Sequence, residues 1–171
     1  MNNESKREWI NELFNKYQGR LLRYTRRWVK ESDAQEIVQD LFIKLLNLED
    51  SEKIKGRERS WLFFVCRNQA IDCLRKEKKM SSKDVDELSS FDLKGGDEVI
   101  EGKQTQSLIL QLVDQLKPKQ KEVIVLKFQE DLSYAEISEI TGLSVSHVGV
   151  LIHEAIKKMK SNYQLSSQGR S

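Results

Sequence analysis

The sequence has little of what β-sheet and disulfide-bonded proteins need. It contains one proline, eight glycines and two cysteines in 171 residues. An all-β chain would need many turns built from proline and glycine, so their scarcity favours helices. No apolar run approaches the roughly 20 residues that cross a membrane, and the polar start MNNESKREW is unlike a secretory signal. We therefore expect a soluble, cytoplasmic protein with no membrane insertion.

The few cysteines and histidines also limit the chemistry. Cys66 and Cys73 are separated by roughly 10.5 Å along one predicted helix, whereas a disulfide spans at most about 7 Å. We interpret both as small hydrophobic residues in a reducing compartment, with a redox sensor as the alternative. His147 and His153 fall on different faces of a helix and have no neighbouring ligands in the sequence. The sequence therefore predicts no metal site and no cofactor.

Charge is nearly balanced over the whole chain, at a net +2, but it is unevenly distributed. Residues 1–79 contain 18 Lys and Arg against 13 Asp and Glu. Residues 80–106 contain 3 against 7, and residues 107–171 contain 8 against 7. The first segment is therefore the basic one, and the middle segment is acidic.

Apolar periodicity predicts helices in residues 1–79. A first helix is expected over residues 5–30, and Ser32 or Asp33 is placed to cap a second one. The charged stretch 49–59 is predicted to be a loop, and Ser60 to cap a third helix. The second helix has a wide apolar face, formed by Ile37, Val38, Leu41, Phe42, Leu45 and Leu46.

The acidic segment 80–106 has no sustained period and is predicted to be a flexible linker between two small domains, 1–79 and 107–171. The second domain should begin with a helix near Ser107 that ends before Pro118, where a new helix should run to Phe128. The expected fold is therefore all-α, with two small helical domains.

Residues 132–160 have the pattern of a helix-turn-helix. Ser133 and Glu136 can form a capping box, Gly142 suits the turn, and Ser144 can cap the second helix. A plain helical hairpin is the alternative. The side of the second helix expected to face the core consists of Val145, Val148, Ile152, Ala155, Ile156 and Met159. Residues expected outside that core side are Ser146, His147, Gly149, Val150, Leu151 and His153.

Two surfaces of residues 1–79 also suit binding. Basic side chains beside an aromatic one, as at Lys55 and Trp61, suit single-stranded nucleic acid, because cations follow phosphates and the ring stacks on a base. A solvated charged face with a buried tryptophan is the alternative. Glu36 and Asp40 on the second helix have no convergent third group for acid–base catalysis, so a solvated or protein-docking face fits them better.

Three segments resemble bacterial sigma factors of the sigma-70 family. DAQEIVQDLF, residues 33–42, is similar to the helix with which those proteins bind RNA polymerase. WLFFVCRNQAIDCLRK, residues 61–76, resembles their adjoining promoter-melting helix. Residues 116–148, which begin LKPKQKEV and enter the helix-turn-helix, resemble their C-terminal domain. The short two-domain arrangement is similar to the extracytoplasmic-function (ECF) class.

The resemblance implies a transcription initiation factor and not an enzyme. Such a protein binds core RNA polymerase and directs it to promoters, which it recognises at the minus-ten and minus-thirty-five elements. An anti-sigma factor is expected as a further partner. The implied polymerase-binding face consists of Asp33, Glu36, Gln39 and Asp40.

The resemblance also implies two DNA-binding surfaces. One captures the non-template single strand of the minus-ten element and holds a base that is flipped out of the stack. Its residues are Lys53, Lys55, Arg57, Arg59, Trp61, Arg67, Asn68, Arg75 and Lys76. The other reads the minus-thirty-five duplex through Ser144, Ser146, His147 and Val150.

The second helix of the helix-turn-helix departs from the family pattern. Gly149, Leu151 and Glu154 stand where basic residues are common in the family. Each lost phosphate contact weakens DNA affinity and reduces its salt dependence. We therefore expect the isolated protein to bind duplex DNA poorly, with polymerase supplying most of the affinity through the basic residues 1–79.

Two other functions remain open on the sequence alone. A stand-alone sigma-like regulator, which does not direct initiation, would account for the weakly basic helix. An enzyme that uses Cys66, or the Glu36 and Asp40 pair, would need a base beside a nucleophile, and nothing in the sequence positions one.

Overall fold

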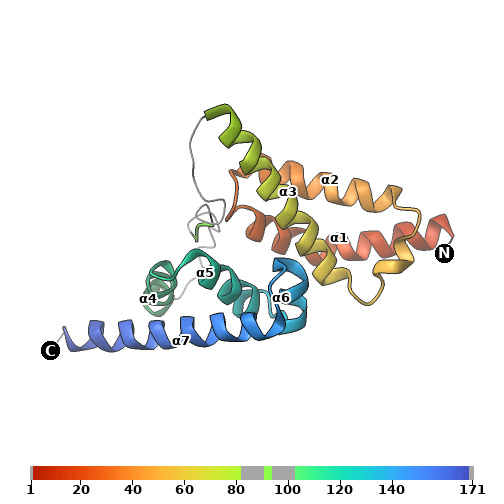
Figure 1. The fold of residues 1–171 in the computed structure, drawn as a ribbon. Helices are drawn as coiled ribbons and strands as arrows, with labels where there is room; N and C mark the ends of the chain where they lie inside the picture. Colours follow the sequence, from red (N-terminus) through yellow and green to blue (C-terminus); the bar gives the residue numbers. More distant parts are fainter. Residues whose placement is uncertain (1, 82–90, 94–102, 170–171) are drawn as a thin grey trace. The chain divides into compact units, whose positions relative to one another are not determined.

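A computed structural model describes residues 2–81, 91–93 and 103–169. The regular elements within those residues are all helical and form two compact units (Figure 1). The all-α class with two small helical domains is therefore confirmed. None of the helices in the described ranges is long and apolar enough to cross a membrane.

The described residues of the first unit form three α-helices, α1 (Asn3–Thr25), α2 (Glu31–Asn47) and α3 (Glu58–Ser81). A 3₁₀ turn, η1 (Ser51–Ile54), lies between α2 and α3. Each of the three helices contacts the other two, so they enclose one shared core.

Apolar side chains at intervals of three and four build this core, as the periodicity of α1 and α2 predicts. Tyr24 of α1 and Phe63 of α3 are fully buried and meet edge to face, with ring centroids 5.3 Å apart. The predicted apolar face of α2 is buried except for Leu46, which is 47% exposed. The α3 side chains in the core include Leu62, Phe63, Cys66 and Ala70.

The helix boundaries differ from the predicted ones in three places. α1 ends at Thr25 because the chain turns over residues 26–29, where Trp28 stays buried and so continues the apolar spacing beyond the helix. α2 already begins at Glu31, so neither Ser32 nor Asp33 caps it. Ser60 lies inside α3, where its hydroxyl is buried and donates to the Arg57 carbonyl at 3.1 Å.

The described part of the second unit contains four α-helices and a π-type turn. α4 (Lys103–Asp114) begins earlier than predicted, whereas α5 (Pro118–Ile124) begins at the proline as predicted. The turn η3 (Val125–Gln129) continues α5 to about the predicted end. α6 (Tyr134–Thr141) and α7 (Val145–Gln168) follow, and α7 contacts α4, α5 and α6.

Parts of the predicted linker 80–106 have structure. α3 extends to Ser81, and α4 occupies the segment from Lys103. Between them, Phe91 and Leu93 are buried and group with the second unit. The rest of the predicted linker lies outside the described residues.

Candidate nucleic-acid and protein interfaces

The predicted polymerase-binding residues lie along one side of α2. Glu36, Gln39 and Asp40 are exposed and follow each other within one helical turn. Asp33, in the first turn, has a side chain only 23% exposed, and the Lys30 Nζ lies 3.8 Å from its Oδ2. The structure therefore groups three of the four residues on an open surface, with Asp33 half-buried at its end.

An apolar groove of about 630 Å³ lies beside Gln39, between α1 and α2. Phe14 and Phe42 line it and meet edge to face, with ring centroids 5.0 Å apart. Ile43 and Leu46, both in its lining, are 54% and 47% exposed. The polar residues in the groove lining are Arg7, Glu8, Asn11 and Gln39, so an apolar floor with a polar rim suits contact with another protein.

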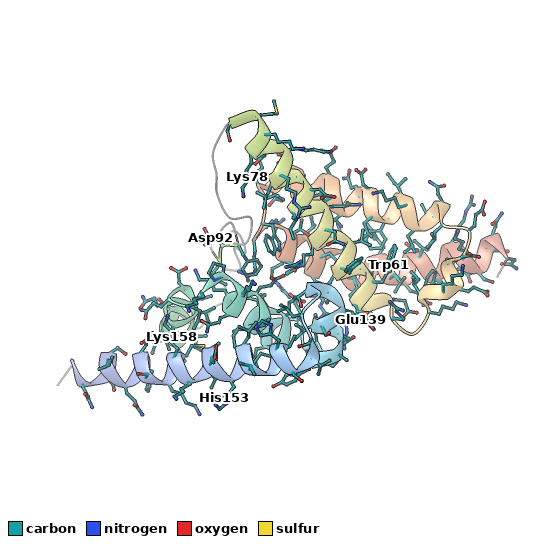
Figure 2. The ribbon with its side chains drawn as sticks, in the orientation of Figure 1. Trp61, Lys78, Asp92, Glu139, His153 and Lys158 are labelled. Atoms are coloured by element: carbon teal, nitrogen blue, oxygen red, sulfur yellow. The ribbon has the colours of Figure 1, made fainter. Side chains whose placement is uncertain are left out.

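The exposed face of α3 combines aromatic and basic residues. Trp61, Asn68 and Arg75 recur every seven residues and therefore lie on the same side of the helix. Trp61 is partly exposed near the helix start, and Lys78 lies near its end (Figure 2). Phe64, one turn after Trp61, is 41% exposed and extends the aromatic surface. The exposure of Phe64 was not predicted from the sequence, because this residue lies in an unbroken run of apolar residues.

Two arginines predicted for the minus-ten surface are only partly exposed. The Arg67 guanidinium sits 5.5 Å from the ring of buried Trp28, roughly 120° around α3 from Trp61. Arg59 belongs to the first turn of α3, not to the predicted loop, and is partly buried. The Arg67 guanidinium is therefore directed toward Trp28, away from the Trp61 side of α3.

Of the remaining basic residues of this surface, Lys76 is exposed on α3 and the other three lie around η1. Ile54 is buried and anchors the loop, while Lys53, Lys55 and Arg57 are exposed. Lys53 is paired with the Asp50 carboxylate through its Nζ. Gly56, with φ of +83°, makes the turn that leads into α3.

The caps of the helix-turn-helix form as predicted. The Ser133 Oγ accepts from the Glu136 backbone N–H at 3.1 Å, and the Glu136 Oε2 accepts from the Ser133 N–H at 2.8 Å. Gly142 ends α6 in the left-handed conformation, with φ of +76°. At the start of α7, the Ser144 Oγ accepts from the His147 N–H at 3.1 Å.

The outward side of α7 largely matches the prediction. Ser146, His147 and Val150 are exposed and lie within the first two turns. Two residues were assigned to the wrong side. Val145 is 49% exposed because it is the first residue of α7, and Leu151 is only 8% exposed because it follows buried Val148 by three residues.

The ammonium group of Lys127 lies beside this surface, although the sequence did not predict it there. A Cβ built on Gly149 would meet the Tyr134 ring at 3.4 Å, so the ring lies directly against this part of α7. The Lys127 Nζ is 5.4 Å from the centroid of the same ring and donates to the Leu132 carbonyl at 3.3 Å. Lys127 comes from η3, and no local pattern in the sequence links it to α7.

The cysteines offer no activated nucleophile. Burial raises the pKa of the Cys66 thiol to about 12, so it stays protonated at neutral pH. Cys73 is partly exposed. The pKa of its thiol is raised, most of all by burial and then by the carboxylates of Asp33 and Glu77. Both thiols are free. The interpretation of Cys66 as a buried hydrophobic residue is confirmed.

Two protein-family models match this chain, one over each of the two units. "Sigma-70 region 2" matches residues 13–80, and "Sigma-70, region 4" matches residues 106–159. "RNA polymerase sigma factor SigV" of Bacillus subtilis (strain 168) is 34% identical over 130 residues, covering 76% of this chain and 75% of the relative. The chain belongs to the sigma-70 family. Its ECF class follows from relatives such as "ECF RNA polymerase sigma factor SigW" of the same organism, 32% identical over 139 residues, 74% of each chain.

A solved structure has the same fold. The "Structure of CnrH in complex with the cytosolic domain of CnrY" matches with a TM-score of 0.60 at 20% identity, covering 93% of this chain and 90% of that one. Sigma factors are non-enzymatic, so the enzyme alternative is rejected, and family membership does not favour the stand-alone regulator.

Proposed function

We propose that this sigma factor binds core RNA polymerase and directs it to promoters with minus-ten and minus-thirty-five elements. The observation that supports this most is the presence of both regions in one chain, each with an exposed surface of suitable chemistry. A stand-alone helix-turn-helix regulator would have no use for the first unit.

Polymerase docks on the exposed side of α2. Glu36 and Asp40 offer carboxylates to a basic partner, and Gln39 offers an amide at the rim of the apolar groove. Ile43 and Leu46 provide the apolar area that such a contact buries. Asp33 contributes less, because most of its side chain is already buried.

The minus-ten strand binds along α3 and the loop before it. Trp61, with Phe64 one turn later, provides rings on which unpaired bases stack. Lys55 and Arg57 from the loop, and Arg75 and Lys76 farther along α3, hold the phosphates. Asn68 lies between the rings and the basic end. Arg59 and Arg67 act at the edge of this surface or by stabilising the unit.

The minus-thirty-five duplex meets the start of α7. Ser146 and His147 offer polar contacts to bases or phosphates, and Val150, 52% exposed, offers an apolar contact to a thymine methyl group. Ser144 holds the first turn in place through its capping bond. Lys127 supplies a phosphate contact from outside the helix, in place of the basic residue that Gly149 lacks.

The protein acts in the cytoplasm, where its polymerase is, and an anti-sigma factor regulates it. The similar protein CnrH was solved with the cytosolic domain of another protein, CnrY. The apolar groove of the first unit is also a surface that a regulator of this kind could occupy in competition with polymerase.

Run-off transcription from a library of randomised promoters tests the function. Core RNA polymerase from the source organism is used with and without the protein. We expect protein-dependent transcripts that start downstream of one shared two-part motif. Failure to bind polymerase, together with specific operator binding by the protein alone, would support the regulator instead.

A further inference from the structure

A thiol and two carboxylates meet where the start of α2 lies beside α3. Asp33, Cys73 and Glu77 each offer one ligand atom, and these three atoms lie within 4.8 Å of one another. Cys73 and Glu77 are one turn apart on α3, whereas Asp33 comes from the first turn of α2. The packing of the two helices therefore creates the cluster, and no sequence motif signals it.

The donor set indicates a class of cation. A thiolate with carboxylates suits zinc and similar thiophilic divalent ions, whereas magnesium and calcium take oxygen ligands. Tetrahedral zinc would need sulfur and oxygen ligands roughly 3.6 Å apart, somewhat closer than the upper limit seen here. Glu77 is exposed, so a change of its rotamer can bring its carboxylate oxygen to the distance that zinc requires.

The surrounding charges favour a cation. The carboxylates of Asp33, Glu77 and Glu36 act on the Cys73 thiol, together with the ammonium group of Lys30. The Lys30 Nζ is 3.8 Å from the Asp33 Oδ2, beyond hydrogen-bond distance, and the lysine side chain is 70% exposed. A bound ion could displace this loose pairing at little cost, because an exposed ion pair contributes little stability.

We propose that Asp33, Cys73 and Glu77 form a binding site for one thiophilic divalent cation of the zinc class. On binding, the Cys73 thiol releases its proton to solvent and the sulfur bonds to the metal, with water completing the coordination. The ion would link the first turn of α2 to α3. It would also withdraw Asp33 from the polymerase-binding face, a consequence that rests on the proposed function.

Cobalt(II) is a direct probe, because a cobalt–thiolate bond absorbs by charge transfer. The full-length protein, reduced and freed of metal by a chelator, is titrated with cobalt(II) and then with zinc(II). We expect absorption that saturates at one ion per chain and disappears as zinc replaces cobalt. Cys73→Ser should abolish it. Asp33→Asn and Glu77→Gln should each weaken binding at least about tenfold, because even outer-shell partners of a metal contribute roughly that much.

Asp72→Asn is the matched control. Asp72 is an exposed carboxylate next to Cys73, outside the cluster, and its loss should leave the cobalt titration unchanged. Circular dichroism of every variant checks that the helices form. An absent band, a band that survives Cys73→Ser, or affinity unchanged by Asp33→Asn and Glu77→Gln would each overturn the proposal. None of these results bears on promoter-directed transcription, since polymerase is absent from the titration.

Discussion

At the scale of single residues, the connection between η3 and α6 contains a conformation that few side chains adopt. Asp131 has φ of +53° and is the only residue other than glycine with positive φ among those described. Left-handed backbone costs most L-residues about 1–2 kcal/mol, and Asp tolerates it better than most because its side chain bonds locally. Asp131 lies in the short connection through which the chain passes from η3 into α6.

We expect Asp131→Ala to be less stable than Asp131→Gly by about 1 kcal/mol, since glycine adopts positive φ without strain. Urea unfolding followed by circular dichroism measures the difference. Equal midpoints for the two variants would mean that the connection relaxes to another conformation.

Lys127 is the second residue with a specific consequence. Its ammonium has three donors, so it can bond to the Leu132 carbonyl and still contact a phosphate. We expect Lys127→Ala to weaken promoter binding by the polymerase complex similarly on all sequences. The slope of log affinity against log salt should fall by about one.

Lys160 is an exposed lysine far along α7. The variant Lys160→Ala is the control and should leave that slope unchanged. A loss of affinity that depended on the minus-thirty-five sequence would instead mean that Lys127 contacts a base.

At the scale of elements, α2 and α3 each have one buried face and one exposed face that is available for binding. Their buried faces share one core, so substitutions on the exposed faces should change binding without unfolding the unit. This separation allows polymerase binding and DNA melting to be tested independently.

Asp40→Arg should weaken association with core polymerase, because it reverses a charge in the centre of the exposed side of α2. Glu12→Arg makes the same charge change at an exposed position of α1 outside the groove lining. Pull-down or fluorescence anisotropy with labelled protein measures both variants. Undiminished association of Asp40→Arg would show that polymerase binds another face.

Trp61→Ala and Lys55→Ala should each impair promoter melting more than polymerase binding, because they remove a stacking ring and a phosphate contact. Fluorescence of 2-aminopurine in the minus-ten element follows melting, and anisotropy follows polymerase binding. Tyr163→Ala removes a half-exposed aromatic ring from α7 and should affect neither. Parallel losses in both assays would contradict the assigned roles of Trp61 and Lys55.

At the scale of the whole molecule, the basic charge is concentrated in the first unit, while the start of α7 has none of its own. We expect the isolated protein to bind promoter duplex weakly and the polymerase complex to bind it tightly. Gel shifts at one fixed salt concentration compare the two. Tight, specific binding by the protein alone would contradict the prediction that polymerase supplies most of the affinity.

The sequence by itself determined the helical class, the helix-turn-helix caps and, for most positions, which side of a helix is exposed. These features are local: caps join residues three apart, and amphipathic faces repeat every three or four residues. Helix ends were less predictable, because buried Trp28 continues the apolar spacing into the turn after α1.

Only the tertiary structure decided which residues from separate elements meet. Packing of α1 on α2 leaves Leu46 at a groove and not in the core. Packing of α2 on α3 brings Asp33 to Cys73, and η3 brings Lys127 to the Tyr134 ring beside Gly149. Such contacts depend on how whole helices pack against each other, and local residue patterns do not encode that packing.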